Sequence, residues 1–192
     1  MKLERSFYLN PDVVAVARSL LGKYLYTNFE GKFCGGMITE TEAYRGVTDR
    51  ASHAYGNRRT PRTEVMYQEG GLAYVYLCYG IHSLFNVVTN GKDSPHAVLV
   101  RGMIPEFGLD HMTERLNKNS ITAKNTNGPG KLTKALGIHF SHTGLNLRGD
   151  RIWIEDRGIL IEDDKITTGS RIGVDYAKED ASLPYRFVLQ SF

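Results

Sequence analysis

The chain has 192 residues, of which 41% are hydrophobic, so residues 1–192 can bury one sizeable core as a single domain. The formal net charge is only +3, which argues against a broad basic coat for non-specific nucleic-acid binding. No apolar run approaches 18 residues, so a membrane-spanning helix is excluded. The two cysteines, Cys34 and Cys78, form neither a metal-binding spacing nor a convincing disulfide framework.

The first predicted element is a helix that begins at Asn10-Pro11-Asp12. Asn10 would cap it, Pro11 would occupy its first turn, and Gly22 would end it. The residues ahead of it lack the apolar core of a secretory signal. We therefore expect a cytoplasmic, nucleoid-associated protein in a prokaryote, or a nuclear one in a eukaryote.

Residues 23–44 are strand-like, with a turn expected at Glu30-Gly31. Alternation along a strand would place Glu40, Glu42 and Tyr44 on one face. Two carboxylates roughly 7 Å apart along one strand resemble the acid/base pair of a water-activating glycosidase. The alternative is a pair of surface glutamates that form ion pairs with arginine.

Residues 45–62 form a polar loop that concentrates positive charge. It contains five arginines and one acidic residue, a local net charge of +4. Such a local excess favours a phosphate contact, although a simply solvated loop would have the same composition. His53 lies within this loop, where it could either line a pocket or serve only a structural role.

A short helix is expected over residues 63–68, followed by strands at 72–79, 83–89 and 96–102. The first of these strands would place Tyr74, Tyr76 and Cys78 on one face, with Cys78 buried as a small apolar residue. Tyr79 comes directly before Gly80, a predicted turn. An aromatic side chain at a hairpin tip could enter a base stack, where stacking contributes about 1–3 kcal/mol per base.

Further helices are predicted over residues 106–118 and from about 131 to 136, with short strands near 151–155, 171–174 and 185–190. Helices and strands alternate without a βαβ rhythm, which predicts one α+β domain. His139 and His142 are the nearest approach to a metal-binding pair, and we interpret them as non-ligands. The sequence predicts no metal site and no organic cofactor.

Several blocks in this order resemble the alkyladenine DNA glycosylases, also called methylpurine-DNA or 3-methyladenine DNA glycosylases. The resemblance extends over nearly the whole chain, and its blocks are residues 40–44, 58–62, 74–76, 79–80, 127–132, 171–174 and 184–187. It implies an α+β domain with a curved antiparallel β-sheet surrounded by helices. It also implies hydrolysis of the N-glycosidic bond of alkylated or deaminated purines that are flipped out of duplex DNA. An abasic site would remain, without lyase activity, because no lyase-type lysine or helix-hairpin-helix signature is present.

The resemblance assigns roles to particular residues. Glu42 matches the family's water-activating base, and Arg101 and the Val174 backbone match groups that hold the water. Asn86 matches the residue that crowds the 2-amino group of guanine. The side chains that would stack around the flipped base are Tyr44, His53 and Tyr76.

The remaining matched residues would contact double-stranded DNA that contains damaged purines, and a monomer would suffice for this. Tyr79 matches the side chain that enters the helix where the base left. The DNA-facing loop would present Arg58, Thr60 and Arg62. Ile81 and His82 depart from the family pattern, and the role of His82 stays open.

Two other functions are compatible with the same residues. A non-catalytic lesion sensor or RNA-binding module could use the basic loop and the tyrosines without releasing a base. Hydrolysis of free nucleosides is less favoured, because a nucleoside has no phosphate for the arginines at 58–62 to contact.

Overall fold

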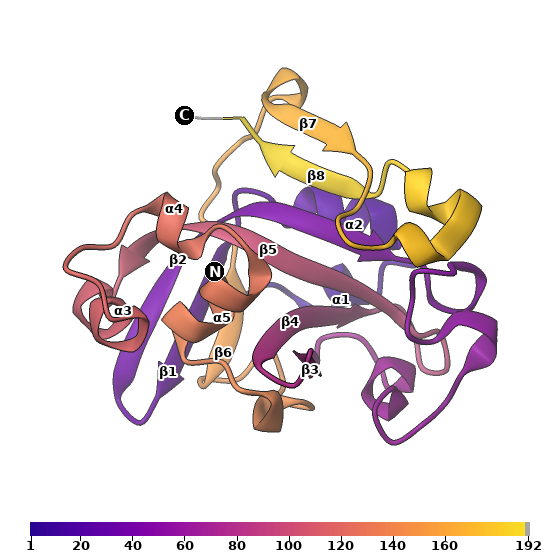
Figure 1. Ribbon diagram of the computed structural model, residues 1–192, viewed down its shortest axis with the longest axis horizontal. Coiled ribbons are helices and arrows are strands. Elements are labelled where there is room, and N and C mark those ends of the chain that lie inside the picture. The colour runs from indigo at the N-terminus through magenta and orange to yellow at the C-terminus, as the bar shows by residue number, and fades with distance from the viewer. Residues whose placement is uncertain (191–192) are drawn as a thin grey trace.

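Two long antiparallel strands, β2 (Lys32–Tyr44) and β5 (His96–Phe107), cross the centre of the computed structural model (Figure 1). The structure describes residues 1–190. The main sheet has the order β3-β4-β5-β2-β1-β6. The other strands of this path are β3 (Ala73–Cys78), β4 (His82–Thr89), β1 (Tyr24–Phe29) and β6 (Ile152–Glu155).

A second pair of antiparallel strands joins the sheet at the part of β2 that carries Glu40 and Glu42. It consists of β7 (Ile166–Gly169) and β8 (Arg186–Leu189), and β8 pairs with β2 from Glu40 to Glu42. One edge of β2 is therefore shared between β1 and β8, and β5 covers the other. As a result, the segment that carries both glutamates lies between two neighbouring strands.

The pairing of β2 with β5 is irregular around Glu40, where the register shifts on both sides of that residue. Such bulges bend a strand and increase its twist, which contributes to the curvature of the sheet. Glu40 and Glu42 nevertheless share a face, because both carboxylates contact the Arg101 guanidinium. The predicted α+β class with a curved antiparallel sheet is confirmed.

The first long helix, α2 (Val13–Ser19), begins later than the sequence suggested. The Asp12 side chain caps it by accepting hydrogen bonds from the amides of Val14 and Ala15. Asn10 accepts instead from the Asp12 amide, so Pro11 lies before the helix and not in its first turn. The prediction of Asn10 as the cap was wrong because Asn10 and Asp12 are both favourable capping residues, and the Asp12 oxygen is the one that accepts from the first helix amides.

The other helices cover the sheet. In Figure 1, α5 (Pro129–Leu136) lies in front of the sheet and α2 behind it. The predicted helix at 106–118 is the shorter α3 (Leu109–Leu116), because β5 continues to Phe107. Two single-turn helices were not predicted, α1 (Arg5–Tyr8) and α4 (Ala123–Thr126).

Six 3₁₀ helices complete the described chain, and three of them surround the site: η1 (Gly46–Thr48), η2 (Tyr55–Asn57) and η6 (Asp175–Ser182). The others are η3 (Glu64–Tyr67), η4 (Phe140–His142) and η5 (Asp163–Lys165). A small apolar cluster around Met66, Tyr67 and Tyr74 lies apart from the main core. It supports the loop at 45–62 from one side.

The strand predicted near 171–174 is wrong, because this segment is an irregular loop. Gly173 adopts a left-handed conformation with φ of 73°, which interrupts an extended ladder. The Ile172 amide donates to the Glu42 side chain instead of to a neighbouring strand. The strand in this region is β7, which ends before the loop begins. No helix among residues 1–190 is both long and apolar enough to cross a membrane.

Candidate active site

Glu42 lies at the end of β2 with no exposed side-chain surface. Its Oε1 accepts a hydrogen bond of 2.8 Å from the Ile172 amide, and its Oε2 accepts one of 2.8 Å from the Tyr44 hydroxyl. The Arg101 Nε lies 3.4 Å from Oε1. Burial raises the pKa of Glu42, while Arg101, the amide and the hydroxyl oppose that rise. The carboxylate is thus a stronger base than an exposed glutamate.

Glu40 lies on the same face but in a different environment. Its Oε1 accepts hydrogen bonds from Arg101 Nε at 2.9 Å and from Arg186 Nε at 2.7 Å. This side chain is therefore paired with arginine, which was the alternative considered for both glutamates. Because Glu40 holds two guanidinium groups, it positions Arg101 and does not provide a second, free acid.

A cavity of about 450 Å³ lies in front of the Glu42 environment. It is lined by all of the side chains that were predicted to surround a flipped base: Tyr44, His53, Tyr76 and Asn86. Arg101, Ile172 and Val174 line it as well. The structure thus brings together residues from β2, β3, β4, β5 and two loops. Such a volume falls within the usual range for small-ligand sites.

The aromatic walls of the cavity are held by side-chain contacts. The His53 ring meets the Tyr76 ring edge-on, with centroids 4.6 Å apart, and its Nδ1 lies 2.8 Å from the Tyr74 hydroxyl. Arg62 contacts the other ring nitrogen, Nε2, at 3.4 Å. Because arginine can only donate, Nε2 is assigned as the acceptor and Nδ1 carries the proton. Burial, aided by Arg62 and Arg58, lowers the pKa of His53 to about 4, so its ring is neutral at neutral pH.

Asn86 is buried against this cavity. Its side-chain amide donates to the backbone carbonyls of Tyr74 at 3.2 Å and Leu84 at 3.4 Å. Two backbone partners fix the orientation of the amide. A ligand atom that collides with Asn86 would therefore meet a side chain that cannot easily turn away.

Tyr79 lies at the tip of the β3–β4 hairpin, at the rim of the cavity. Its side chain is 93% exposed, and its backbone adopts a left-handed conformation with φ of 51°. A non-glycine residue in this conformation is strained by about 1–2 kcal/mol. Ile81, in the same turn, is also exposed. The structure holds two apolar side chains in solvent at this tip, with no packing that explains them.

The arginines of the 45–62 loop differ in whether acidic side chains already pair with them. Glu64 and Asp93 bind Arg59, which also stacks on Tyr67 with its guanidinium 4.7 Å from the ring centroid. Glu179 pairs with Arg50. The side chains predicted to face DNA line a second hollow, of about 510 Å³, that shares His53 with the first: Arg58, Thr60 and Arg62.

A family model described as Methylpurine-DNA glycosylase (MPG) matches residues 6–191. The chain belongs to this family. A relative from Chlamydia felis (strain Fe/C-56) is 47% identical over 188 residues, which cover 97% of this chain and 95% of the relative. A relative from Desulfitobacterium hafniense (strain Y51) is 44% identical over 197 residues, or 98% and 95% of the two chains. Both carry the provisional name 3-methyladenine DNA glycosylase. The resemblance recognised from the sequence is confirmed.

Membership in the methylpurine-DNA glycosylases supports action on alkylated purines in DNA. Two local features of the site were not predicted from the sequence. The Val174 carbonyl accepts a hydrogen bond from the Ala177 amide at 2.8 Å, and the backbone contact to Glu42 comes from Ile172. Cys78 is half-buried and lines the cavity, so the expectation of a buried residue was wrong. Beyond Leu77 the hairpin extends out of the core, and burial no longer follows strand alternation.

In this member of the family, the two C-terminal histidines are engaged in local contacts. The His142 Nδ1 accepts a hydrogen bond of 3.0 Å from the His139 amide, and its ring stacks on Phe29 with centroids 4.0 Å apart. Among residues 1–190, no group of three or more histidine, cysteine or acidic side chains could hold a metal ion.

Proposed function

We propose that this protein hydrolyses the N-glycosidic bond of damaged purines flipped out of duplex DNA, with Glu42 activating the attacking water. The observation that carries the proposal is an enclosed glutamate of raised pKa beside an aromatic cavity, with an arginine-lined hollow next to that cavity. The cavity suits a planar base, and the hollow suits the phosphates that flank it.

The environment of Glu42 supports its role as a general base. Each carboxylate oxygen can accept a second hydrogen bond besides the one from the Tyr44 hydroxyl or the Ile172 amide, and the attacking water would take that place once it reaches the enclosed carboxylate. Arg101 lies close enough to orient that water and to balance the negative charge. A positioned base typically contributes about 10²- to 10⁴-fold to the rate.

The aromatic walls support the binding of a cationic leaving group. Alkylation at a ring nitrogen makes a purine positively charged, so it departs with little help from an acid. The rings of Tyr44 and Tyr76 can attract such a cation, although a guanidinium already lies near each ring centroid, that of Arg171 at 4.8 Å and that of Arg62 at 4.9 Å. Because His53 is neutral, it adds no further positive charge to a wall that already contains Arg62.

Tyr79 supports extrusion of the base from the duplex. Its exposed ring at the cavity rim could occupy the space that the flipped nucleotide leaves in the stack. Stacking on an aromatic ring contributes about 1–3 kcal/mol, comparable with the few kcal/mol that unstacking costs. The strained backbone of Tyr79 then has a functional reason.

We extend the proposal to deaminated purines such as hypoxanthine, with slower release because a neutral base is a poorer leaving group. The nucleophile is water and not a protein amine, so the DNA strand stays intact at the abasic site. The protein acts as a monomer on double-stranded DNA, in the nucleoid-containing cytoplasm if its source is a prokaryote or in the nucleus if its source is a eukaryote. Size-exclusion chromatography with and without duplex DNA tests the oligomeric state, and localisation of a tagged protein tests the location in the cell.

The test uses two duplexes, one with a single 7-methylguanine and one with a single hypoxanthine, incubated with the pure protein in EDTA. We expect free base from the wild type, an intact strand before alkali treatment, and no base from Glu42→Gln, which should still bind the duplex. Glu114→Gln, at an exposed glutamate paired with Lys32, is the matched control and should release base normally.

Other outcomes would favour the competing functions. Tight binding of both duplexes without any released base would favour a lesion sensor. Parallel loss of binding and release in Glu42→Gln would argue against a catalytic role for this carboxylate. Turnover of free inosine would revive nucleoside hydrolysis.

A further inference from the structure

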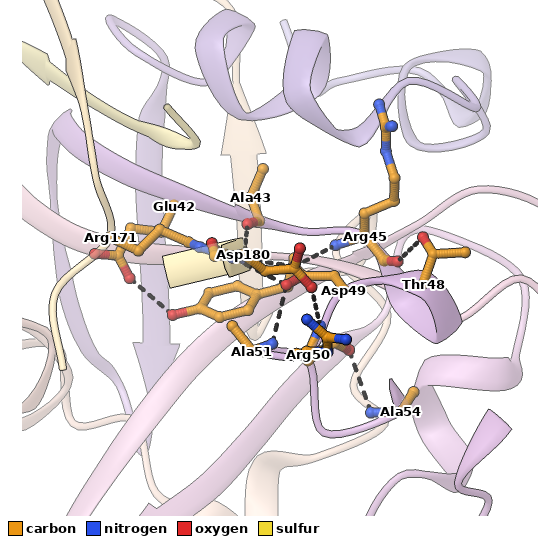
Figure 2. Close-up of polar contacts among 12 residues, drawn as sticks. Glu42, Ala43, Arg45, Thr48, Asp49, Arg50, Ala51, Ala54, Arg171 and Asp180 are labelled. Atoms are coloured by element: carbon orange, nitrogen blue, oxygen red, sulfur yellow. Dashed lines mark hydrogen bonds and ion pairs between the residues drawn. The ribbon is translucent and has the colours of Figure 1, made fainter. Parts of the chain in front are cut away.

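A buried ion pair joins Arg171 to Asp49, whose side chains are 0% and 2% exposed. The pairing is bidentate, with Nη1 2.5 Å from Oδ2 and Nη2 2.9 Å from Oδ1 (Figure 2). The carboxylate also accepts hydrogen bonds of 3.0 Å from the amides of Arg45 and Ala51. Buried ion pairs contribute little net stability, because desolvation offsets their attraction.

The Arg171 guanidinium contacts strand β2, which carries Glu42, the candidate general base. Its Nη1 donates to the Ala43 carbonyl at 2.9 Å, and its Nη2 donates to the Asp180 carbonyl at 3.0 Å (Figure 2). Ala43 lies between Glu42 and Tyr44 in the chain. The guanidinium also lies 4.8 Å from the centroid of the Tyr44 ring. One side chain thus touches both the backbone and the ring of the cavity wall.

Arg171 is also the immediate neighbour of Ile172, whose amide donates to Glu42 Oε1. The Tyr44 hydroxyl donates to Oε2 of the same carboxylate. Both hydrogen-bond donors of Glu42, apart from Arg101, therefore sit on groups that the ion pair holds. We propose that Arg171, fixed by Asp49, is a positioning residue that sets the Tyr44 hydroxyl and the Ile172 amide against Glu42. This inference rests on the proposed function of Glu42 as a base.

A pH-dependent readout can distinguish positioning from a purely structural role. The titratable and charged groups that face Glu42 come from β2, β5, β8 and the 171–174 loop, and they are Glu40, Tyr44, Arg101, Arg171 and Arg186. Hydrogen bonds from the amide and the hydroxyl stabilise the ionised carboxylate. If they loosen, the pKa of Glu42 rises further, and the acid limb of base release moves to higher pH. Loss of folded protein alone would lower the amplitude and leave that limb in place.

The experiment compares three variants. Arg171→Lys keeps a charge but loses the two-pronged fork that matches Asp49. The double variant Arg171→Met with Asp49→Leu removes both charges at similar volume, so that no unpaired charge stays buried. Arg5→Lys is the control, because Arg5 also makes a bidentate contact, through Nε and Nη2 to Glu69 on the surface, at 2.7 Å for both bonds.

Two quantities are measured for each variant: single-turnover release of 7-methylguanine across pH, and the titration of the Glu42 carboxyl by ¹³C NMR in the DNA-free protein. We expect both Arg171 variants to slow release by about 10- to 100-fold, as small misplacements in a site do, and to move both midpoints to higher pH. Arg5→Lys should match the wild type.

Unchanged midpoints in folded Arg171 variants would overturn the inference. The double variant keeps the test available if Arg171→Lys does not fold, because it leaves no lone buried charge. The NMR titration needs no turnover. A wild type without glycosylase activity would therefore overturn the proposed function, while the titration would still decide whether Arg171 positions the donors of Glu42.

Discussion

The enclosed end of the cavity and the exposed tip of the β3–β4 hairpin place functional side chains in opposite ways. Glu42 is fully buried and held by an amide, a hydroxyl and a guanidinium. Tyr79 is almost fully exposed and held only by a strained backbone. A catalytic carboxylate needs a fixed orientation, which several contacts enforce. A side chain that enters the DNA stack makes its contacts only in the complex. Substitutions in these two regions should therefore differ in how much they change activity relative to stability.

The largest effect is expected at Glu42. Replacement by glutamine should reduce base release by about 10²- to 10⁴-fold or more, because the general base is lost. The free energy of unfolding should stay equal or rise, because a neutral amide is cheaper to bury than a carboxylate whose pKa is raised by burial. Urea unfolding beside single-turnover kinetics measures both. A large fall in stability would mean that Glu42 is part of the structural framework.

His53 tests whether the enclosed wall depends on a neutral ring. Its pKa in the folded protein is about 4, below the ordinary value of 6.5, so the unfolded chain binds more protons between these two values. Its contribution to stability should therefore be complete above pH 6.5 and be lost as pH falls toward 4. His53→Asn should flatten this part of the stability curve. His82→Asn, at an exposed histidine, is the control and should keep the wild-type slope.

Tyr79→Gly should separate stability from lesion capture. Glycine removes about 1–2 kcal/mol of left-handed strain and costs about 0.5–1 kcal/mol in chain entropy, so a small gain in stability is expected. Capture of a paired lesion should weaken about tenfold, in line with the loss of one stacking contact. Leu160→Ala, at an exposed leucine far along the chain, should change neither property. An equal loss of activity on a paired lesion and on an already unpaired base would contradict the role of Tyr79 in filling the space left by the flipped base.

The smallest effect is expected at Asn86. Asn86→Ser removes a side chain whose amide is fixed by two carbonyls, and so opens space beside the bound base. Release of undamaged guanine should rise by a few-fold, while release of 7-methylguanine changes little. The ratio of the two rates in long duplex DNA measures the effect. An unchanged ratio would show that guanine is excluded elsewhere in the cavity.

Local patterns were sufficient for much of the fold. Alternation predicted that Glu40 and Glu42 share a face, and the two contacts of Arg101 confirm it. A tyrosine before a glycine predicted the exposed hairpin tip. These features depend on residues close in the chain, where backbone geometry alone sets which side chains meet. Where two local signals competed, as at Asn10 and Asp12, the predicted helix start was wrong.

The sequence by itself determined the family, the α+β class and the set of residues that meet at the cavity. Only the tertiary structure decided how the two glutamates differ, because the arginines that engage Glu40 come from β5 and β8. It also decided that Arg59 is engaged by acids while Arg62 stays at the cavity, and that Asp49 meets Arg171 across 122 positions of the chain. Charge and burial at a site depend on side chains that arrive from distant segments, and no local pattern records which of them will meet.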